Sequence, residues 1–225
     1  MKINYLLNSG FLLQMAECDI LIDYMRGDFK QPPDKRLYIL ASHSHGDHYS
    51  KNIWNYNGDN VYYILSSDIK REKAANIFFL EKGGSYKDDC LSVQAFGSTD
   101  QGISFLIEIS GKSIFHAGDL NNWHWNEEST PEEIKEAEDF YEEEINFISK
   151  KCKHVNIAFF PVDPRLGKDY MKGGIQFLEK IPTDVFVPMH FGEKYDKANL
   201  FETSATVRGV EFIKINSPGE IYNYL

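Results

Sequence analysis

The sequence has few cysteines, and none is placed as a disulfide or a zinc-binding pair would require. Its three cysteines, Cys18, Cys90 and Cys152, are odd in number and widely separated, and no CxxC pair occurs. Such usage is typical of a reducing compartment, in which thiols stay free. We therefore expect a cytoplasmic protein whose cysteines pack as small apolar residues.

Long apolar runs and an excess of positive charge are also missing. No apolar stretch approaches the roughly 20 residues that a membrane-spanning helix needs, and the N-terminus lacks a signal-peptide cleavage pattern. Lysine and arginine total 24 against 34 aspartates and glutamates, so the formal net charge is -10. Because nucleic acids bind basic surfaces, we expect neither a nucleic-acid nor a membrane partner, but a small-molecule substrate. Nothing in the sequence indicates an oligomeric state.

The pattern of apolar segments predicts one mixed α/β domain over residues 1–225. Short apolar strands alternate with turn residues, beginning with a hairpin around Asn8-Ser9-Gly10. A capping box at Thr130-Pro-Glu-Glu133 predicts a helix over residues 130–151, and a second helix is expected over 170–180. The sequence Ser66-Ser67-Asp68, with Gly83-Gly84 further on, predicts another helix running to about Leu80.

The densest group of reactive side chains follows the apolar strand at residues 37–41. The sequence Ala41-Ser-His-Ser-His-Gly-Asp-His-Tyr-Ser50 places His43, His45, Asp47 and His48 within six positions. Neutral imidazole and carboxylate are the ligand types that borderline divalent metals prefer. We therefore interpret the segment as part of a metal site rather than as a solvated polar loop.

Other predicted strands also end in residues of ligand type. Asp23 closes the strand at 20–22, Asp119 follows the strand at 112–116, and His190 follows the strand at 184–188. Asp23 alone reads equally well as a turn former. Together these positions predict a shared edge at which several strand ends converge.

The order of these residues resembles the metallo-β-lactamase superfamily. The pattern consists of His43-x-His45-x-Asp47-His48, preceded by a strand that ends in Asp23 and followed by Gly118-Asp119 and Pro188-Met-His190. The resemblance implies a four-layer αββα sandwich with a metal site along one edge of its two sheets. Within the superfamily the chain looks most like the branch of metal-dependent hydrolases that contains sugar-phosphate lactonases.

The resemblance also implies roles for single residues. His43 and His45 belong to one metal position, Asp47, His48 and His190 to the other, and Asp119 bridges them. Asp23 is then expected to orient the ligand histidines, which need a carboxylate or carbonyl partner. One or two divalent ions are expected, with zinc as the first candidate and manganese, iron or nickel as alternatives.

The chain departs from the superfamily pattern in one loop. Relatives usually supply a further histidine after the strand at 91–96, but this chain reads Gly97-Ser98-Thr99-Asp100 there. Ser98 or Asp100 is then left to face the metal or the substrate. A single-metal site held by Asp47, His48, Asp119 and His190 and a two-metal site completed by water both stay open.

Four residues outside the motif are weaker candidates. His116 is expected to support the ligands or the packing, because strand alternation turns it away from Asp119. His124 is read either as a proton donor lining the pocket or as part of a surface aromatic cluster. Asp163 and Arg165 are candidates for binding a polar or anionic substrate group, although an ordinary Asp-Pro turn explains them nearly as well.

These residues together predict a metal-dependent hydrolase. A metal-activated water would attack an ester, lactone or phosphoester-type substrate, and Asp47 would accept a proton. The chain has no G-x-S-x-G nucleophile elbow that would indicate a serine hydrolase. The alternatives are a non-catalytic or weakly active metal-binding module and, less favoured, a diiron redox protein.

Overall fold

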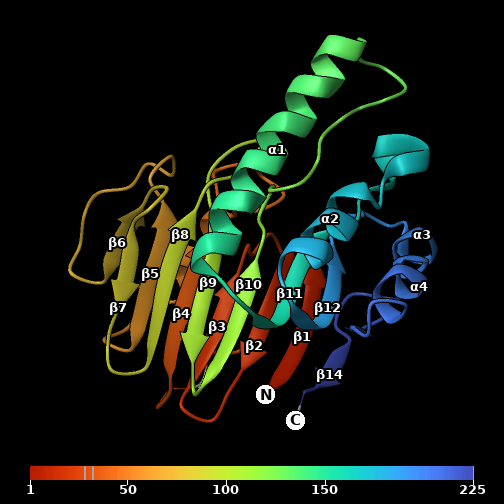
Figure 1. The fold of residues 1–225 in the computed structure, drawn as a ribbon. Helices are drawn as coiled ribbons and strands as arrows, with labels where there is room; N and C mark the ends of the chain where they lie inside the picture. The colour runs from red at the N-terminus through yellow and green to blue at the C-terminus, as the bar shows by residue number, and fades with distance from the viewer. Residues whose placement is uncertain (28, 32, 225) are drawn as a thin grey trace.

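Two mixed sheets stack face to face in the computed structural model, which describes residues 1–27, 29–31 and 33–224 (Figure 1). The first sheet has the strand order β14-β1-β2-β3-β4-β5-β6. Its strands are β1 (Lys2–Leu7), β2 (Gly10–Gln14), β3 (Cys18–Ile22), β4 (Arg36–Ala41), β5 (Val61–Ser66), β6 (Ile77–Leu80) and β14 (Ile221–Asn223). The second sheet has the order β13-β12-β11-β10-β9-β8-β7. Its strands are β7 (Ser85–Lys87), β8 (Leu91–Phe96), β9 (Ser104–Ile109), β10 (Lys112–His116), β11 (Val155–Pro161), β12 (Thr183–Met189) and β13 (Glu211–Phe212).

The central strand β4 shows why the first sheet is buried on both faces. Its side chains alternate between the two faces, as the period of an extended chain requires. Tyr38 and Leu40 enter the core between the two sheets, whereas Leu37 and Ile39 enter a second apolar layer on the outer face. Because β4 pairs in parallel with both β3 and β5, its unbroken apolar sequence is typical of a strand covered on both sides.

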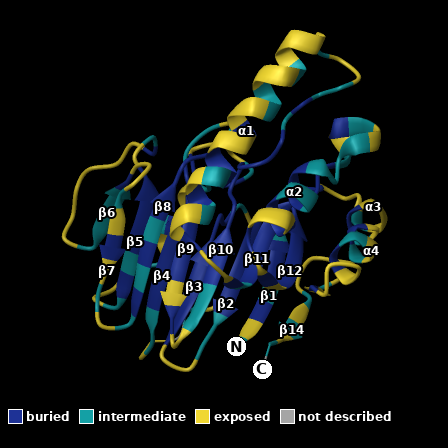
Figure 2. Ribbon diagram, in the orientation of Figure 1, coloured by how far each residue is buried: buried dark blue, intermediate teal, exposed yellow. Residues whose placement is uncertain are grey.

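Helices cover the outer face of the second sheet (Figure 1). They are α1 (Pro131–Lys151), α2 (Lys172–Lys180), α3 (Tyr195–Asn199) and α4 (Phe201–Thr206). The predicted capping box at the start of α1 is confirmed: the backbone N–H of Thr130 donates to Glu133, and the backbone N–H of Glu133 donates to the Thr130 hydroxyl. The second half of α1 buries Tyr141, Ile145 and Ile148, while its first half is largely exposed (Figure 2).

The outer face of the first sheet has a thinner cover. It is covered by the 3-10 helix η1 (Lys51–Asn55) and by loops, which contribute Ile53, Trp54 and Tyr56 to the outer apolar layer. The helix predicted from Ser67 to about Leu80 was wrong, because its last four residues pair with β5 as the parallel strand β6. The mixed α/β fold class with two stacked sheets is confirmed.

The topology brings one set of strand ends to a common rim. β3, β4 and β5 run parallel in the first sheet, and β10, β11 and β12 run parallel in the second. The C-terminal ends of β3, β4, β10 and β12 are the points at which the predicted ligand residues occur. Within the described ranges, no helix has the length and apolar character that a membrane crossing requires.

Candidate metal centre

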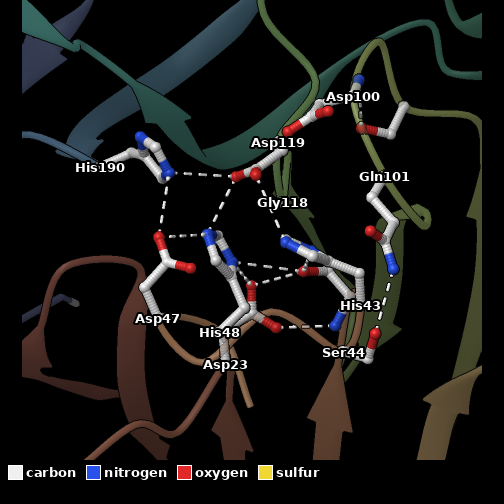
Figure 3. Close-up of polar contacts among 12 residues, drawn as sticks. Asp23, His43, Ser44, Asp47, His48, Asp100, Gln101, Gly118, Asp119 and His190 are labelled. Carbon is white, nitrogen blue, oxygen red and sulfur yellow. Dashed lines mark hydrogen bonds and ion pairs between the residues drawn. The ribbon is translucent and has the colours of Figure 1, made fainter. Parts of the chain in front are cut away.

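Asp119 lies at the middle of the predicted ligand residues (Figure 3). Its Oδ2 atom is 3.3 Å from Nε2 of His43. Its Oδ1 atom is 2.9 Å from Nε2 of His48 and 3.3 Å from Nε2 of His190. The two oxygens of one carboxylate therefore face two different sets of histidines, which is the arrangement that a bridging ligand requires.

Two groups of ligand atoms share this carboxylate. The potential ligand atoms lie within 4.8 Å of one another in each group. One group consists of His43, His45 and Asp119, and the other of His48, Asp119 and His190. Asp47 joins the second group, since its Oδ2 atom is 3.5 Å from Nε2 of His190 and 3.6 Å from Nε2 of His48. The structure thus brings together all six side chains predicted as metal ligands.

Unsatisfied buried atoms show that these side chains fit a metal. Nε2 of His43, Nε2 of His48 and Oδ1 of Asp119 are buried, and the polar atoms that face them among the described residues belong to the cluster itself. When a histidine is neutral with its proton on Nδ1, its Nε2 atom is an acceptor that the Asp119 carboxylate cannot satisfy, and such a buried atom costs roughly 1–3 kcal/mol. Because these atoms converge on one region and are of the nitrogen and oxygen types that divalent metals bind, a metal ion would satisfy them together.

The backbone adopts a left-handed conformation at three positions in or next to the cluster. Asp23, Gly118 and His190 have φ angles of 47°, 54° and 61°, in the left-handed region. For residues other than glycine this region costs about 1–2 kcal/mol, and such strain concentrates at functional sites. At Gly118 a side chain is also excluded by space, because a Cβ atom would lie 2.8 Å from Cβ of Ser42. Glycine at 118 therefore lets β10 approach the loop that carries the histidines.

Asp23 is the buried carboxylate that orients the histidines. Its Oδ2 atom is 2.7 Å from Nδ1 of His48. The same oxygen accepts a hydrogen bond from the Ser42 hydroxyl at 2.7 Å, and this hydroxyl lies 3.0 Å from Nδ1 of His43. Burial by itself would raise the pKa of Asp23, but the adjacent His48 and His116 rings outweigh it and hold that pKa at about 2. Asp23 therefore stays ionised, and both histidines keep Nε2 turned toward Asp119.

His190 is oriented in the same way by a different carboxylate. Its Nδ1 atom is 3.0 Å from Oδ2 of Asp163, and Nε of Arg165 donates to both oxygens of that carboxylate at 3.0 and 2.9 Å. Burial opposes protonation of His190, but Asp163 and Asp47 raise its pKa to about 9. Asp163 was predicted to bind substrate. In the structure, however, its two carboxylate oxygens contact His190 and Arg165 instead.

Metal binding is expected to release about two protons at pH 7. Burial would lower the pKa of His48, but Asp23 and Asp119 raise it to about 10, and the pKa of His190 is about 9. Both rings are therefore protonated at pH 7 in the metal-free protein, whereas a metal ligand must be a neutral imidazole. Apparent metal affinity should rise with pH until about pH 10. Calorimetric titration in buffers of different ionisation enthalpy measures the protons released, and a value near zero would contradict the assignment of both histidines.

The loop that departs from the superfamily pattern brings Asp100 to the site. His45, Asp100 and Asp119 line a cavity of about 350 Å³ over the cluster, and Figure 3 shows the Asp100 carboxylate beside that of Asp119. Ser98, which was predicted to bind substrate, does not line this cavity: its side chain is buried and its hydroxyl accepts the backbone N–H of Asp100 at 3.3 Å. Of the two alternatives, Asp100 is the residue that faces the site.

His116 and His124, the two other histidines considered as site residues, have ring nitrogens that contact groups outside the cavity. His116 is fully buried, donates from Nε2 to the Ser9 carbonyl at 2.9 Å, and accepts the Gly118 N–H at Nδ1. His124 was a candidate proton donor, but its Nε2 faces the Asp169 carbonyl at 3.3 Å and its Nδ1 accepts the backbone N–H of Asn126. Because neither ring nitrogen of His124 is free to reach the cavity, the structure does not support that role.

Some residues at the site had no signal in the sequence. Ser42 bridges Asp23 and His43, and Asn8 donates from its amide to Asp47 at 3.2 Å. Trp123 and Trp125 line the small cavity and stack on one another with ring centroids 6.1 Å apart. Serine and asparagine are common in turns, so only the fold shows that these two reach the ligands.

The chain matches known proteins in sequence. The family model described as a beta-lactamase superfamily domain matches residues 2–136, a span that contains every predicted ligand except His190. A UPF0173 metal-dependent hydrolase from Alkaliphilus metalliredigens is 29% identical over 140 residues, covering 53% of this chain and 63% of that protein. The matched region thus spans less than two thirds of that relative's length.

Solved structures share the fold at lower identity. Igni18, a metallo hydrolase from Ignicoccus hospitalis, is 18% identical with a TM-score of 0.68, covering 100% of this chain and 99% of that protein. CmlA, a diiron beta-hydroxylase from Streptomyces venezuelae, is 10% identical with a TM-score of 0.64, covering 96% of this chain and 52% of that protein. At such identities these likenesses show the fold alone.

Proposed function

Since this chain belongs to the beta-lactamase superfamily, we propose that it is a metal-dependent hydrolase that uses a metal-activated water. The observation that carries the proposal is the convergence of buried nitrogen and oxygen atoms of His43, His48 and Asp119 at the strand ends, where they face one another and no other partner among the described residues. Ester, lactone and phosphoester-type bonds are the substrate classes that we propose for it.

The two halves of the cluster supply the ligands. His43, His45 and Asp119 would hold one divalent ion, and Asp47, His48, Asp119 and His190 would hold the other, with zinc as the first candidate. A metal held there supplies Lewis acidity, which lowers the pKa of a bound water from about 15.7 toward 7.

The side chains around the ligands have separate tasks. Asp47 has a side chain that is 47% exposed and faces the cavity, so it is placed to take up a proton from the attacking water. Trp123 and Trp125 give the cavity an aromatic wall that excludes water from one side of a bound substrate. Asp23 and Asp163 keep their histidines in the tautomer that leaves Nε2 free for the metal.

We further propose a cytoplasmic location, which is supported by the three free cysteines. A small molecule is the substrate that the cavity of about 350 Å³ supports, since ligand pockets commonly measure 300–1,000 Å³.

Metal content and turnover measured together test the hydrolase proposal. The purified protein should contain one or two divalent ions by elemental analysis, and it should hydrolyse at least one member of a panel of a lactone, an aryl ester, a phosphodiester and a phosphomonoester. Chelation should abolish that turnover and metal should restore it. A metal-loaded protein that is inert toward the whole panel would favour the metal-binding module, and oxygen consumption with iron bound would favour the redox alternative.

A further inference from the structure

A second and larger cavity opens beside the metal cluster. Its volume is about 630 Å³, and it shares Asp47, Arg165 and His190 with the smaller cavity over the ligands. Its walls come from the β1–β2 turn, from the segment after β3, from the 3-10 helix η2 (Pro164–Asp169) and from the loop after β12. Because the two cavities meet at these three residues, a molecule in the larger one can place one end over the cluster.

The larger cavity combines apolar walls with positive charge. Leu7, Met25 and Phe191 supply apolar surface. Three cations, Arg26, Arg165 and Lys194, line the same space, although the chain as a whole carries a net charge of -10. An apolar pocket with a few convergent charged groups is the form that small-molecule sites commonly take.

Arg165 is held in place for binding. Its Nε atom lies 3.0 and 2.9 Å from the two oxygens of Asp163, so the guanidinium plane is fixed on a buried carboxylate. Nη2 also donates to that carboxylate, but the side chain is 65% exposed and lines the cavity, which leaves the N–H groups of Nη1 available to a ligand. A guanidinium fixed in this way loses little conformational entropy when it binds an anion.

Arg26 and Lys194 have no competing ion-pair or hydrogen-bond partner among the described residues. Both are exposed, and neither side chain makes an ion pair or hydrogen bond within the part of the chain that the structure describes. Of the three acids that line the cavity, Asp47 faces His190 and Asp163 pairs with His190 and Arg165, so Glu193 is the one that no described residue engages. Two uncommitted cations, Arg26 and Lys194, therefore stand against one uncommitted carboxylate, beside the guanidinium that Asp163 fixes.

We propose that this cavity binds the anionic end of the substrate, a carboxylate or a phosphoryl group, which is joined by a short apolar segment to the bond that is hydrolysed. Arg26, Arg165 and Lys194 bind the anion, while Leu7, Met25 and Phe191 contact the apolar segment. The inference rests on the proposed hydrolase function and names its substrate class.

Matched esters test the proposal through a common leaving group. The metal-loaded protein should hydrolyse mono-4-nitrophenyl glutarate with kcat/KM at least about tenfold above that for 4-nitrophenyl butyrate, because a charge-assisted hydrogen bond contributes at least that much. The 4-nitrophenyl ester of 4-phosphonobutanoate carries a phosphonate in place of the carboxylate, so comparing it with the glutarate monoester shows which anion the cavity prefers. The Arg26→Gln/Lys194→Gln variant should lose about tenfold more kcat/KM for the anionic esters than for the neutral ester, and the additional loss should arise in KM.

The Lys73→Gln/Lys150→Gln variant is the matched control. It removes the same charge from two exposed positions outside both cavities, so it should leave all three esters unchanged. An equal loss in the two double variants, or equal kcat/KM for the neutral and anionic esters, would overturn the cavity assignment.

Binding measured by calorimetry separates this inference from the hydrolase proposal. Glutarate should bind the metal-loaded wild type about tenfold more tightly than the Arg26→Gln/Lys194→Gln variant. If no ester is hydrolysed but glutarate shows this difference, the cavity assignment stands and ester hydrolysis fails. If the esters are hydrolysed but glutarate does not distinguish the variants, the cavity assignment fails and the hydrolase proposal stands.

Discussion

Replacing His48 by alanine is expected to lower kcat/KM at least about a thousandfold and to remove metal from the position that it shares with Asp47 and His190. His48 is fully buried, and among the described residues its Nε2 atom faces only the other ligand atoms of the cluster. Its loss removes the ring whose Nε2 atom lies 2.9 Å from Oδ1 of Asp119 and leaves those of His43 and His190 at 3.3 Å from that carboxylate. Elemental analysis and turnover of the best substrate, measured on the same preparation, check the prediction.

A second histidine provides a matched control for this variant. His154 has a side chain that is 46% exposed and pairs with Asp184 at 2.7 Å, far from the strand ends that form the cluster. His154→Ala should keep its metal and its activity within about twofold, as is usual for surface substitutions. Full metal content and turnover in His48→Ala would remove His48 from the site.

Replacing Asp23 by asparagine is expected to weaken metal binding about 10- to 100-fold without removing any ligand. Asparagine keeps the shape of the side chain and tolerates the left-handed φ of 47° at this position. The charge that holds His48 and Ser42 is lost, so the metal-free protein should also lose on the order of 3 kcal/mol of unfolding free energy at pH 7.

The pH dependence of that stability difference follows from the two pKa shifts. The pKa of Asp23 is lowered to about 2, so its contribution is present above its unfolded pKa and is lost as the pH falls toward 2. The pKa of His48 is raised to about 10, so its contribution is full below about 6.5 and is lost as the pH rises through 10. Denaturant unfolding of both metal-free proteins across pH measures the difference.

Asp19 on the same strand offers the control for Asp23. It is also fully buried, and its Oδ1 atom pairs with Lys35 at 2.6 Å, near the opposite end of β3 from the metal cluster. Asp19→Asn should lose stability but retain metal affinity. Equal losses of metal affinity in the two variants would show that Asp23 acts through general stability rather than through His48.

The convergence of the predicted ligands could be inferred because several apolar strands are followed by side chains of ligand type, in an order that resembles the metallo-β-lactamase superfamily. An apolar strand precedes each of His43, His48, Asp119 and His190. The strand order of the two-sheet fold brings the C-terminal ends of these strands together. The partners of these residues were less predictable. Asp163 resembles an ordinary turn residue in the sequence, and only the long-range approach of η2 to β12 shows that it orients His190.

The wrong helix at residues 67–80 has a physical cause. Asp68 is a residue type that commonly caps helix N-termini. Here, however, its carboxylate accepts the Ser44 N–H at 2.9 Å and the Gln101 amide at 2.6 Å, which fixes the loop between His43 and His45. Ile77–Leu80 then completes a parallel sheet edge beside β5. Tertiary pairing overrode a local helix signal, because local propensity is worth little against burial.

The tight turn between β1 and β2 has a consequence for how the protein folds. The Ser9 carbonyl accepts a hydrogen bond from His116, and the Asn8 carbonyl accepts the backbone N–H of His190 at 3.3 Å. These contacts join residues more than a hundred positions apart, so a chain emerging from the ribosome cannot close the site until β12 has been synthesised. Contacts of such long range slow folding, and we expect metal to enter late, after the two sheets have docked.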